Sequence, residues 1–402
     1  MIDTIIKKDE YILKLFAKNQ ILERDIFTYL DTKISKLFGI VWLRWTGKTS
    51  YLLRRRRSTP SSIYISCDDS SFLWKNLFDI VDELRKIYNF NVFFLDEIQE
   101  IPHRDMYLKN IYDFLDVQVV FSGSNMIDIT RWWYDLSRRA TLYHMPLFSF
   151  ADYIRITKDF PLLPYTFEDI ITNHFQIAKE HSTWYSKVLF EEYLNYGEFG
   201  YFYEKTDDKI LFNDRLDNAI KKSVFQDLPK FVDISTHNLS KVQELIYFLA
   251  EAGTSDISLN SLSKKINLSV KTTDIYISFL HKIWIIHILD FYGNTTDKIR
   301  KNKKYILWSA NIIKKKSDNI WVVREAFFVS CIHKIINQNG CFSDKISYQS
   351  QTDFVVETWK HKYLFEIWWK SKSRSESNLY VIKDNITIGQ WNNIPLRLFG
   401  LL

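Results

Sequence analysis

Four short apolar segments near the start of the chain end in polar residues and alternate with segments of helical character. The apolar segments are 38–43, 61–69, 90–101 and 117–125, and 72–88 between them has apolar residues at helical spacing. Strands that alternate with helices in this way predict a parallel sheet covered by helices. Because ligands bind beyond the carboxyl ends of such strands, the polar residues that end them mark the edge where a site is expected.

The first of these strands leads into a sequence typical of a phosphate-binding loop. Gly47, Lys48 and Thr49 stand between the strand 38–43 and a helix predicted to begin near Lys48. Backbone N–H groups at a helix N-terminus bind phosphate oxygens, a lysine adds positive charge, and a Ser or Thr hydroxyl binds Mg²⁺. We therefore predict that Lys48 contacts phosphate, that Thr49 binds Mg²⁺, and that Gly47 lets the backbone approach.

Two acidic residues, Asp96 and Glu97, end the apolar strand "VFFLDEIQ". This is the form of a Walker B segment, in which the aspartate holds Mg²⁺ and the glutamate orients or activates a water molecule. Taken alone, such a pair is more often a solvated strand end or a helix cap. The Gly-Lys-Thr sequence upstream favours the functional interpretation.

Two further pairs of polar residues are candidates for the same site. Ser124 and Asn125, in "FSGSN", are predicted to hydrogen-bond the attacking water or the terminal phosphate. Arg138 and Arg139 are predicted to stabilise charge in the transition state, in cis or across a subunit boundary. The alternatives are an ordinary polar turn for the first pair and surface charge for the second.

Composition limits the class of protein. A hydrophobic content of 46% with 25% charged residues predicts a globular protein with a sizeable core. The net charge of +6 permits contact with nucleic acid without requiring it. The three cysteines form no metal-binding pattern and suit a reducing compartment. Without a signal peptide or an apolar run long enough to cross a bilayer, we expect a cytoplasmic protein that does not contact membranes.

The second half of the chain has a different pattern. The segment 241–289 predicts helix, short helix, turn, longer helix and strand, the order of a winged helix-turn-helix. Its longer helix is a candidate for DNA recognition, although its apolar positions equally predict a module that packs against other parts of a protein. The basic run "KIRKNKK" that follows has the composition of a phosphate contact and is more often a solvated loop.

Acidic residues near the end of the chain resemble those of a restriction-endonuclease-like core. Glu325 is predicted on a helix, Asp353 at the start of a strand, and Glu366 on the next strand, with Lys370 beyond it. In that core such acids bind Mg²⁺ and activate water. The lysine is expected two residues after the second acid, where Trp368 stands. The alternative, which we prefer, is a nuclease-like fold used for binding.

The blocks "GKTSYLL", "IYISCDD", "VFFLDEIQEI", "VVFSGSN", "YDLSRRA" and "YHMPLFSFADYI" resemble, in order, those of a bacterial and archaeal group of AAA-type ATP-binding proteins. Members of this group carry a winged-helix region and a C-terminal domain of unknown function. The resemblance implies ATP and Mg²⁺ as cofactors, ATP binding through Gly47, Lys48, Thr49 and Asp96, and Glu97 as catalytic base. Together with the pattern along the chain, we predict an ATPase core at 1–150, a helical lid or linker at 151–230, a winged helix at 231–295 and a nuclease-like α/β domain at 296–402.

Tryptophan stands where the phosphate-binding loop needs its smallest residues. The family pattern is GxxxxGKT, and Trp42 occupies the first glycine position while Trp45 lies inside the loop. The chain has only 10 glycines and as many as 13 tryptophans. We hypothesise that many of these tryptophans are glycines encoded by a reassigned UGA codon; the alternative is true tryptophan enrichment. Further tryptophans at glycine-like positions are Trp132, Trp133, Trp284, Trp321, Trp368 and Trp369.

The sequence therefore predicts an AAA-type P-loop ATPase that couples nucleotide state to its C-terminal domains. One alternative is a non-hydrolysing nucleic-acid-binding or interaction protein with a degenerate loop, and a second is a Mg²⁺-dependent nuclease. DNA or a partner protein is expected to contact the C-terminal half, and a homo-oligomer is a further expectation.

Overall fold

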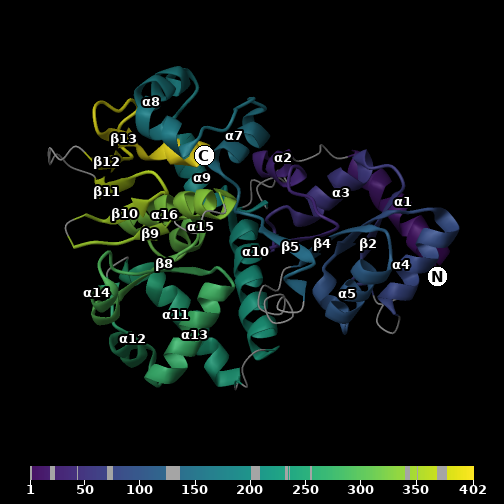
Figure 1. Ribbon diagram of the computed structural model, residues 1–402. Coiled ribbons are helices and arrows are strands. Elements are labelled where there is room, and N and C mark those ends of the chain that lie inside the picture. The colour runs from purple at the N-terminus through teal and green to yellow at the C-terminus, as the bar shows by residue number, and fades with distance from the viewer. Residues whose placement is uncertain are drawn as a thin grey trace. The chain divides into compact units, whose positions relative to one another are not determined.

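The computed structural model of the chain forms two compact units, Met1–Pro146 (unit 1) and Leu147–Leu402 (unit 2) (Figure 1). The described residues are 2–18, 23–42, 44–69, 76–123, 136–200, 209–230, 234, 236–253, 256–339, 345–350, 352–368 and 378–402.

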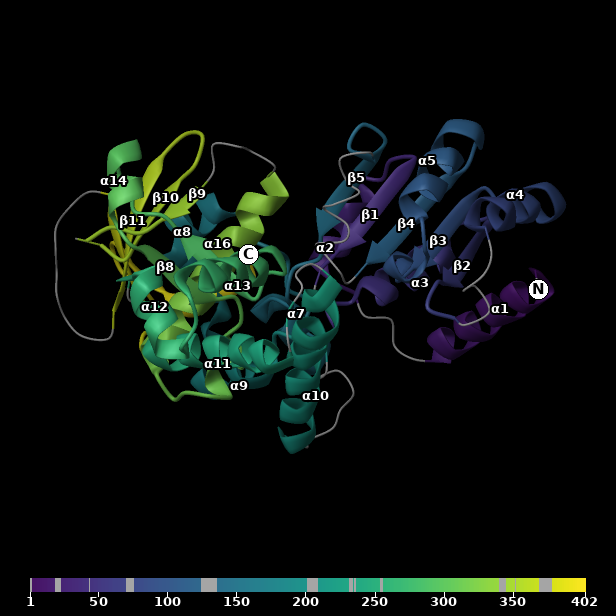
Figure 2. The same ribbon diagram turned by 90° about the horizontal axis from the view of Figure 1, so that it is seen from below.

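Unit 1 is built on a five-stranded parallel sheet, as the alternation of strands and helices predicts. The strand order is β2-β3-β4-β1-β5, so that the first strand lies between the fourth and the fifth (Figure 2). Apart from the first residue of β3, side chains of β1 and β3 are buried, which explains their nearly continuous apolar sequences. The strands are β1 (Leu37–Val41), β2 (Ser62–Ser66), β3 (Val92–Asp96), β4 (Gln118–Gly123) and β5 (Ala140–His144).

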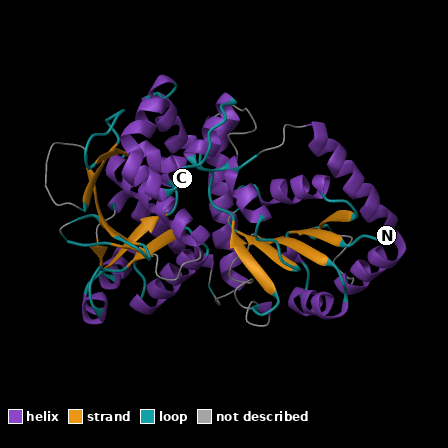
Figure 3. Ribbon diagram, turned by 45° about the horizontal axis from the view of Figure 1, so that its top comes forward, coloured by secondary structure: helices purple, strands orange, loops and turns teal. Residues whose placement is uncertain are grey.

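Helices cover both faces of this sheet (Figures 2 and 3). Asn76 accepts a hydrogen bond from the backbone N–H of Phe78 at 2.9 Å and so caps α4, whose apolar side faces the core. The buried Asp9 joins α1 to the sheet, because its carboxylate accepts hydrogen bonds from Tyr64 N at 2.9 Å and Arg56 Nη2 at 2.7 Å. The helices are α1 (Ile2–Lys18), α2 (Asp25–Asp31), α3 (Lys48–Ser58), α4 (Leu77–Tyr88) and α5 (Arg104–Phe114).

The four strands predicted from the sequence are all present, with ends that differ by a few residues. The fifth strand, β5, was not predicted. It lies at the edge of the sheet, and four of its five side chains are only half-buried. An edge strand of this kind lacks the continuous apolar run that identifies a buried strand.

Unit 2 begins with helices whose starts are fixed by side-chain caps. Ser149 and Asp152 form a capping box at α7, and Thr166 and Asp169 form one at α8. Ser149 lies in "MPLFSF", so the polar residue in that apolar block serves to start a helix. These helices are α7 (Phe150–Lys158), α8 (Phe167–Glu180), α9 (Lys187–Tyr196) and α10 (Lys209–Lys222), followed by a π-helical turn, Ser223–Asp227.

A buried carboxylate joins these helices to the rest of unit 2. The Glu198 carboxylate accepts hydrogen bonds from Ser309 Oγ at 2.6 Å and Asn311 N at 3.0 Å, and Asn311 Nδ2 donates to Leu194 O at 2.8 Å. Burial raises the pKa of Glu198 to about 7. The network satisfies polar groups that would otherwise destabilise the interior.

The middle of unit 2 is a three-helix segment (α11, α12 and α13) with a small antiparallel sheet of order β6-β8-β7 and a short fourth helix, α14 (Figure 1). The three helices and β7 follow the order that the sequence predicts, whereas β6, between α11 and α12, was not predicted. The connection from β7 to β8 contains α14 and is hydrogen-bonded to the residue that follows β9, since Tyr292 N donates to Tyr348 O at 2.7 Å. The elements are α11 (Thr236–Ala252), β6 (Asp256–Ile257), α12 (Leu259–Ile266), α13 (Val270–Lys282), β7 (Ile286–Leu289), α14 (Thr295–Arg300) and β8 (Lys303–Leu307).

The end of unit 2 is a mixed sheet against the long helix α16. The strand order is β13-β12-β11-β10-β9, antiparallel from β9 to β11 and parallel from β11 to β13. The sequence predicts α16, β10 and β11; β9, β12 and β13 were not predicted. The elements are α15 (Ala310–Lys314), α16 (Ile320–Asn339), β9 (Lys345–Ser347), β10 (Phe354–Glu357), β11 (Lys362–Trp368), β12 (Leu379–Lys383) and β13 (Asn393–Pro395).

Candidate nucleotide-binding site

The N-terminus of α3 lies at the carboxyl end of β1. Gly47 is the N-cap residue of α3 and has φ of 89°, a left-handed conformation that glycine adopts without a Cβ clash. Lys48 is the first residue of the helix and is only 5% exposed. Its Nζ donates a hydrogen bond to Trp42 O at 2.9 Å. Burial lowers the pKa of Lys48 to about 8, against the opposing effect of Glu97 and Asp96.

Thr49, the next residue of α3, is joined to the end of β3. Its Oγ1 donates to Asp96 Oδ2 at 2.7 Å. The same carboxylate accepts hydrogen bonds from Tyr64 OH at 2.7 Å and from Ser122 Oγ. Burial raises the pKa of Asp96, and the hydrogen bonds from Ser122, Tyr64 and Thr49 act in the opposite direction. The two residues predicted to bind Mg²⁺ are therefore in contact.

Glu97 follows Asp96 and has a strained backbone. Its φ of 53° and ψ of 48° are left-handed, which is uncommon for a residue of this size. Its N–H donates to Ser122 Oγ at 3.1 Å. Its carboxylate accepts a hydrogen bond from Gln99 Nε2, and one oxygen lies 4.0 Å from Arg44 Nη1. Strain of this kind, held by surrounding hydrogen bonds, is characteristic of functional sites.

The hydroxyl that β4 contributes is that of Ser122. Ser124 and Asn125, which were predicted for this role, lie outside the described residues. Ser122 was not predicted, although it stands in the same "FSGSN" block at the end of an apolar strand. Tyr64 was not predicted either, because its position within an apolar strand gives no signal of a polar contact.

Arg138 and Arg139 lie where the strands of the sheet begin, opposite to the strand ends at which Lys48 and Asp96 lie. Ala140, the first residue of β5, pairs with Leu37 at the start of β1, whereas α3 begins beyond the end of β1. A strand of five residues places its start roughly 15 Å from its end. Arg139 binds both oxygens of Asp113, at 2.8 and 3.0 Å, and Arg138 is exposed. The predicted action of these arginines in cis is therefore corrected: within unit 1 they do not face Asp96. Action across a subunit boundary stays a prediction.

Trp42 and Trp45 occupy the loop in different ways. Trp42 is buried, and its ring lies 5.5 Å from that of His144. The backbone N–H of Trp42 donates a hydrogen bond to Gly123 O at 3.3 Å. Burial lowers the pKa of His144 to about 4. Trp45 is half-exposed, and its φ of 65° is left-handed. The backbone at Trp45 thus has the conformation that the glycine hypothesis requires, whereas Trp42 is distinguished only by its place in the motif.

The other tryptophans at glycine-like positions differ among themselves. Trp284 has a left-handed φ of 60°. Trp321 lies in the first turn of α16, and Trp368 is the last residue of β11, so neither backbone requires glycine. Trp132, Trp133 and Trp369 lie outside the described residues.

In unit 2, the structure brings together the acids predicted for a nuclease-like site. Asp353 precedes β10, and its Oδ2 accepts a hydrogen bond from Ile367 N at 2.7 Å. Burial, reinforced by Glu325 and Glu366, raises the pKa of Asp353 to about 6. The lysine beside these acids is Lys304 of β8, whose Nζ donates to Glu325 Oε2 at 2.8 Å.

The donor set of this acidic cluster does not match a metal site. Across the described ranges, no group of three or more His, Cys, Asp and Glu side chains is placed to hold a metal ion. The predicted Lys370 lies outside those ranges. Lys304 supplies a positive charge from β8. This lysine was not predicted, because β8 is distant from the other residues along the chain.

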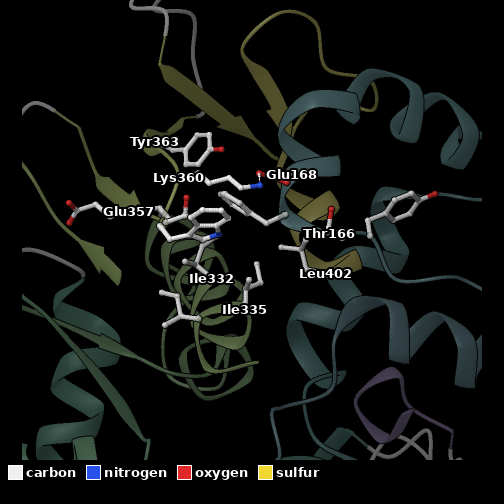
Figure 4. A pocket seen from close by; sticks show the side chains of 14 residues that line it. Thr166, Glu168, Ile332, Ile335, Glu357, Lys360, Tyr363 and Leu402 are labelled. Atoms are coloured by element: carbon white, nitrogen blue, oxygen red, sulfur yellow. Dashed lines mark ion pairs between the residues drawn. The ribbon is translucent and has the colours of Figure 1, made fainter. Parts of the chain in front are cut away.

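Unit 2 also has a cavity of about 340 Å³ between α8, α16 and the turn from β10 to β11 (Figure 4). Ile332 and Ile335 of α16 form an apolar side, and Lys360 Nζ lies 3.9 Å from Glu168 Oε1 at its rim. None of the predicted site residues lines this cavity.

Comparison with known proteins relates two segments of the chain to families. The sequence model of an AAA domain matches residues 34–154, and that of a domain of unknown function matches residues 187–311. An uncharacterized protein of Methanocaldococcus jannaschii is 26% identical over 324 residues, which cover 74% of this chain and 67% of that protein. Among the parts of the chain that the structure describes, no helix is long and apolar enough for a bilayer crossing.

The chain shows only limited similarity to solved structures. The RuvB Holliday junction branch migration motor of Thermotoga maritima is 13% identical, with 71% of this chain and 88% of that chain covered and a TM-score of 0.28. A signal transduction ATPase with a tetratricopeptide repeat sensor from Pyrococcus horikoshii is 9% identical, with 79% and 46% covered and a TM-score of 0.28. These scores are too low to bear on function. The family match over 34–154 and the five-stranded parallel sheet agree, and this segment of the chain is similar to AAA domains.

Proposed function

We propose that unit 1 binds ATP with Mg²⁺ at the N-terminus of α3 and hydrolyses it. The observation that carries the proposal is the 2.7 Å hydrogen bond from Thr49 Oγ1 to Asp96 Oδ2 beside the left-handed Gly47. It joins a helix N-terminus, which favours anions, to a carboxylate at the end of a neighbouring buried strand.

The residues present fit these ligands. Mg²⁺ prefers oxygen donors and commonly binds through one or two protein groups together with phosphate, and Thr49 and Asp96 offer a hydroxyl and a carboxylate side by side. When bound, Mg²⁺ neutralises charge on the phosphates. Lys48 binds phosphate through its ammonium, which then exchanges Trp42 O for a phosphate oxygen. Glu97, held by Gln99, is the candidate to orient and deprotonate water.

The test is equilibrium binding of Mg·ATP. The chain with tryptophan at 42 and 45 and its Trp42→Gly/Trp45→Gly variant are each compared with and without Lys48→Ala. We expect binding in at least the glycine variant and its loss with Lys48→Ala. The control Lys33→Ala removes an exposed lysine of the same unit and is expected to leave binding intact. Absence of Mg·ATP binding in both chains, or binding that survives Lys48→Ala, contradicts the proposal.

Hydrolysis is tested separately. Glu97→Gln keeps the size of the side chain and removes the base, so it should preserve ATP binding and slow phosphate release by about 100-fold or more. Unchanged phosphate release would exclude Glu97 as the base while leaving the binding proposal intact.

The three-helix segment of unit 2 supports a second candidate function, binding to duplex DNA. Between residues 256 and 304 there are nine Lys and Arg residues against four Asp and no Glu, so most of the net charge of +6 arises there. Lys264 and Lys265 of α12 and Lys271 in the first turn of α13 are exposed. An α-helix fits the major groove of B-DNA but not the deep, narrow one of an RNA duplex, which is why we specify DNA.

Binding of a labelled DNA duplex at several salt concentrations tests this candidate. Reversing the charge of Lys264, Lys265 and Lys271 together to Glu should abolish binding and flatten its salt dependence. A control with the exposed Lys7, Lys14 and Lys109 of unit 1 changed to Glu carries the same total charge. Equal loss in both variants, or no binding by the original chain, would contradict a DNA surface on this segment.

A further inference from the structure

Three tryptophans have a left-handed backbone. They are Trp45, with φ of 65°, Trp284, with φ of 60°, and Trp391, with φ of 57°. Residues that tolerate this conformation are glycine and, less readily, Asn, Asp and His, whereas a bulky side chain there is an outlier. Among the described residues with positive φ, the non-glycine positions besides these tryptophans are Ser61, Asn89, Glu97, His103, Asp159 and Asn267.

The backbone around Trp284 is a motif that favours glycine. Trp284 follows Ile283, the C-cap of α13. Its N–H donates to His281 O at 3.0 Å, and the N–H of Ile285 donates to Leu280 O at 2.9 Å. These two hydrogen bonds are those of a Schellman motif, and Trp284 is at the position after the cap, where glycine predominates.

Trp391 lies in a tight turn before β13. Asn393 N donates to Gln390 O at 3.0 Å, so Trp391 is the second residue of a four-residue turn. A positive φ at this place defines the turn types that glycine and asparagine favour. The side chain of Trp391 is 89% exposed, so packing of the indole does not account for the conformation.

Trp184 has the opposite properties. Its φ is −108°, and its Nε1 donates a hydrogen bond to His181 Nδ1 at 3.0 Å. Its ring also meets that of His181 edge to face, with centroids 5.1 Å apart. The side chain of Trp184 therefore makes a hydrogen bond and a ring contact that glycine could not replace.

We infer that positions 45, 284 and 391 carry glycine in the protein that its cell makes, because a UGA codon written as tryptophan is decoded there as glycine. Trp391 is assigned by backbone geometry alone, without regard to any sequence motif. At position 45 the inference deepens the proposed nucleotide site and rests on it for its functional meaning; at 284 and 391 it is independent of that site. The low glycine count of 10 in 402 residues agrees with it.

Peptide masses of protein purified from its native source test the assignment directly. We expect peptides across 45, 284 and 391 to be lighter by the difference between an indolylmethyl group and a hydrogen atom, and the peptide across 184 to contain tryptophan. Tryptophan at all three positions would overturn the inference. Glycine at 184 as well would overturn the geometric basis for choosing among the tryptophans. Neither result depends on whether the chain binds ATP.

A second measurement uses the recombinant chain and separates backbone effects from loss of the indole. Glycine and alanine are each placed at 391 and, as a matched control, at Trp359, which is 69% exposed and is not among the left-handed residues. Glycine should give the higher melting temperature at 391, and alanine should give it at 359. A higher melting temperature with alanine than with glycine at 391 would contradict a left-handed backbone there.

Discussion

Units 1 and 2 each hold a cluster of acidic residues beside a sheet, but different groups surround the carboxylates of the two clusters. In unit 1, the Asp96 carboxylate is surrounded by the hydroxyls of Thr49, Tyr64 and Ser122. In unit 2, Glu325 is paired with the ammonium of Lys304 at 2.8 Å. Hydroxyl groups stabilise a carboxylate without cancelling its charge, whereas a lysine that donates directly to a carboxylate, as Lys304 does, pairs with that charge. Lys48 is the buried lysine near Asp96 and Glu97, but its Nζ donates a hydrogen bond to Trp42 O.

The difference explains why only the first cluster is proposed to bind a metal ion. The hydroxyl of Thr49 can turn its oxygen towards a cation that Asp96 attracts, so both groups become ligands. In the second cluster, a divalent cation would have to displace Lys304 from a mostly buried position. An acid at the end of a buried strand is therefore not sufficient to predict a metal site; the counter-charge around it decides.

The largest effect is expected from removing the internal counter-charge of unit 2. Lys304→Met keeps the length of the side chain but leaves Glu325 without its partner, so we expect a loss of about 3 kcal/mol in the free energy of unfolding. Urea denaturation measures it. Lys303→Met, on the same strand but half-exposed with a 3.6 Å pair to Asp290, should cost less than about 1 kcal/mol. Equal small effects would show that Lys304 is not the counter-charge of the cluster.

A smaller change in the free energy of unfolding, of opposite sign, is expected when Asp353 is replaced. Its pKa of about 6 in the folded chain lies above its ordinary value of 3.8, so the stabilising contribution of the protonated group is present below pH 3.8 and is lost as pH rises through 6. Asp353→Asn should therefore raise the free energy of unfolding by about 2 kcal/mol at pH 8, with little change at pH 3.5. A destabilised Asp353→Asn chain at pH 8 would contradict this account of the cluster.

The smallest effect concerns Lys48 and the pH dependence of ATP binding. Its pKa is about 8 in the free chain, and a bound phosphate raises it, so the complex holds more protons than the free chain above pH 8. ATP affinity should fall by up to about tenfold between pH 8 and pH 9.5. Lys48→Arg, which stays charged, should show no such fall. If the ATP affinities of the two chains changed equally with pH, titration of Lys48 would be excluded as the cause.

The sequence predicts much of unit 1 because its signals are local. The buried strands are continuous apolar runs, and Gly47, Lys48 and Thr49 stand together at one strand-to-helix junction. The contact between Thr49 and Asp96 follows from the rule that parallel strands end at one edge. By the same rule, Arg138, which precedes β5, lies where the strands begin and not where they end. The sequence did not indicate this position, because β5 itself was not predicted.

Contacts between distant segments could not be predicted in this way. Lys304 and Glu325 are 21 residues apart and come from a strand and a helix whose packing no local pattern encodes. Tyr64 has the composition of a core residue until the fold brings its hydroxyl to Asp96. The left-handed backbone at Trp391 carried no sequence signal, since tryptophan is not a turn residue.

The most direct measurement of the central claim is ATP affinity with and without Mg²⁺ in a chain that carries glycine at 42 and 45, before and after Thr49→Val. Valine keeps the shape of threonine and removes the hydroxyl that meets Asp96. If Thr49 and Asp96 form the Mg²⁺ site of a nucleotide pocket, Mg²⁺ strengthens ATP binding in the first chain and has no effect in the second. An equal strengthening by Mg²⁺ in both chains would contradict the account.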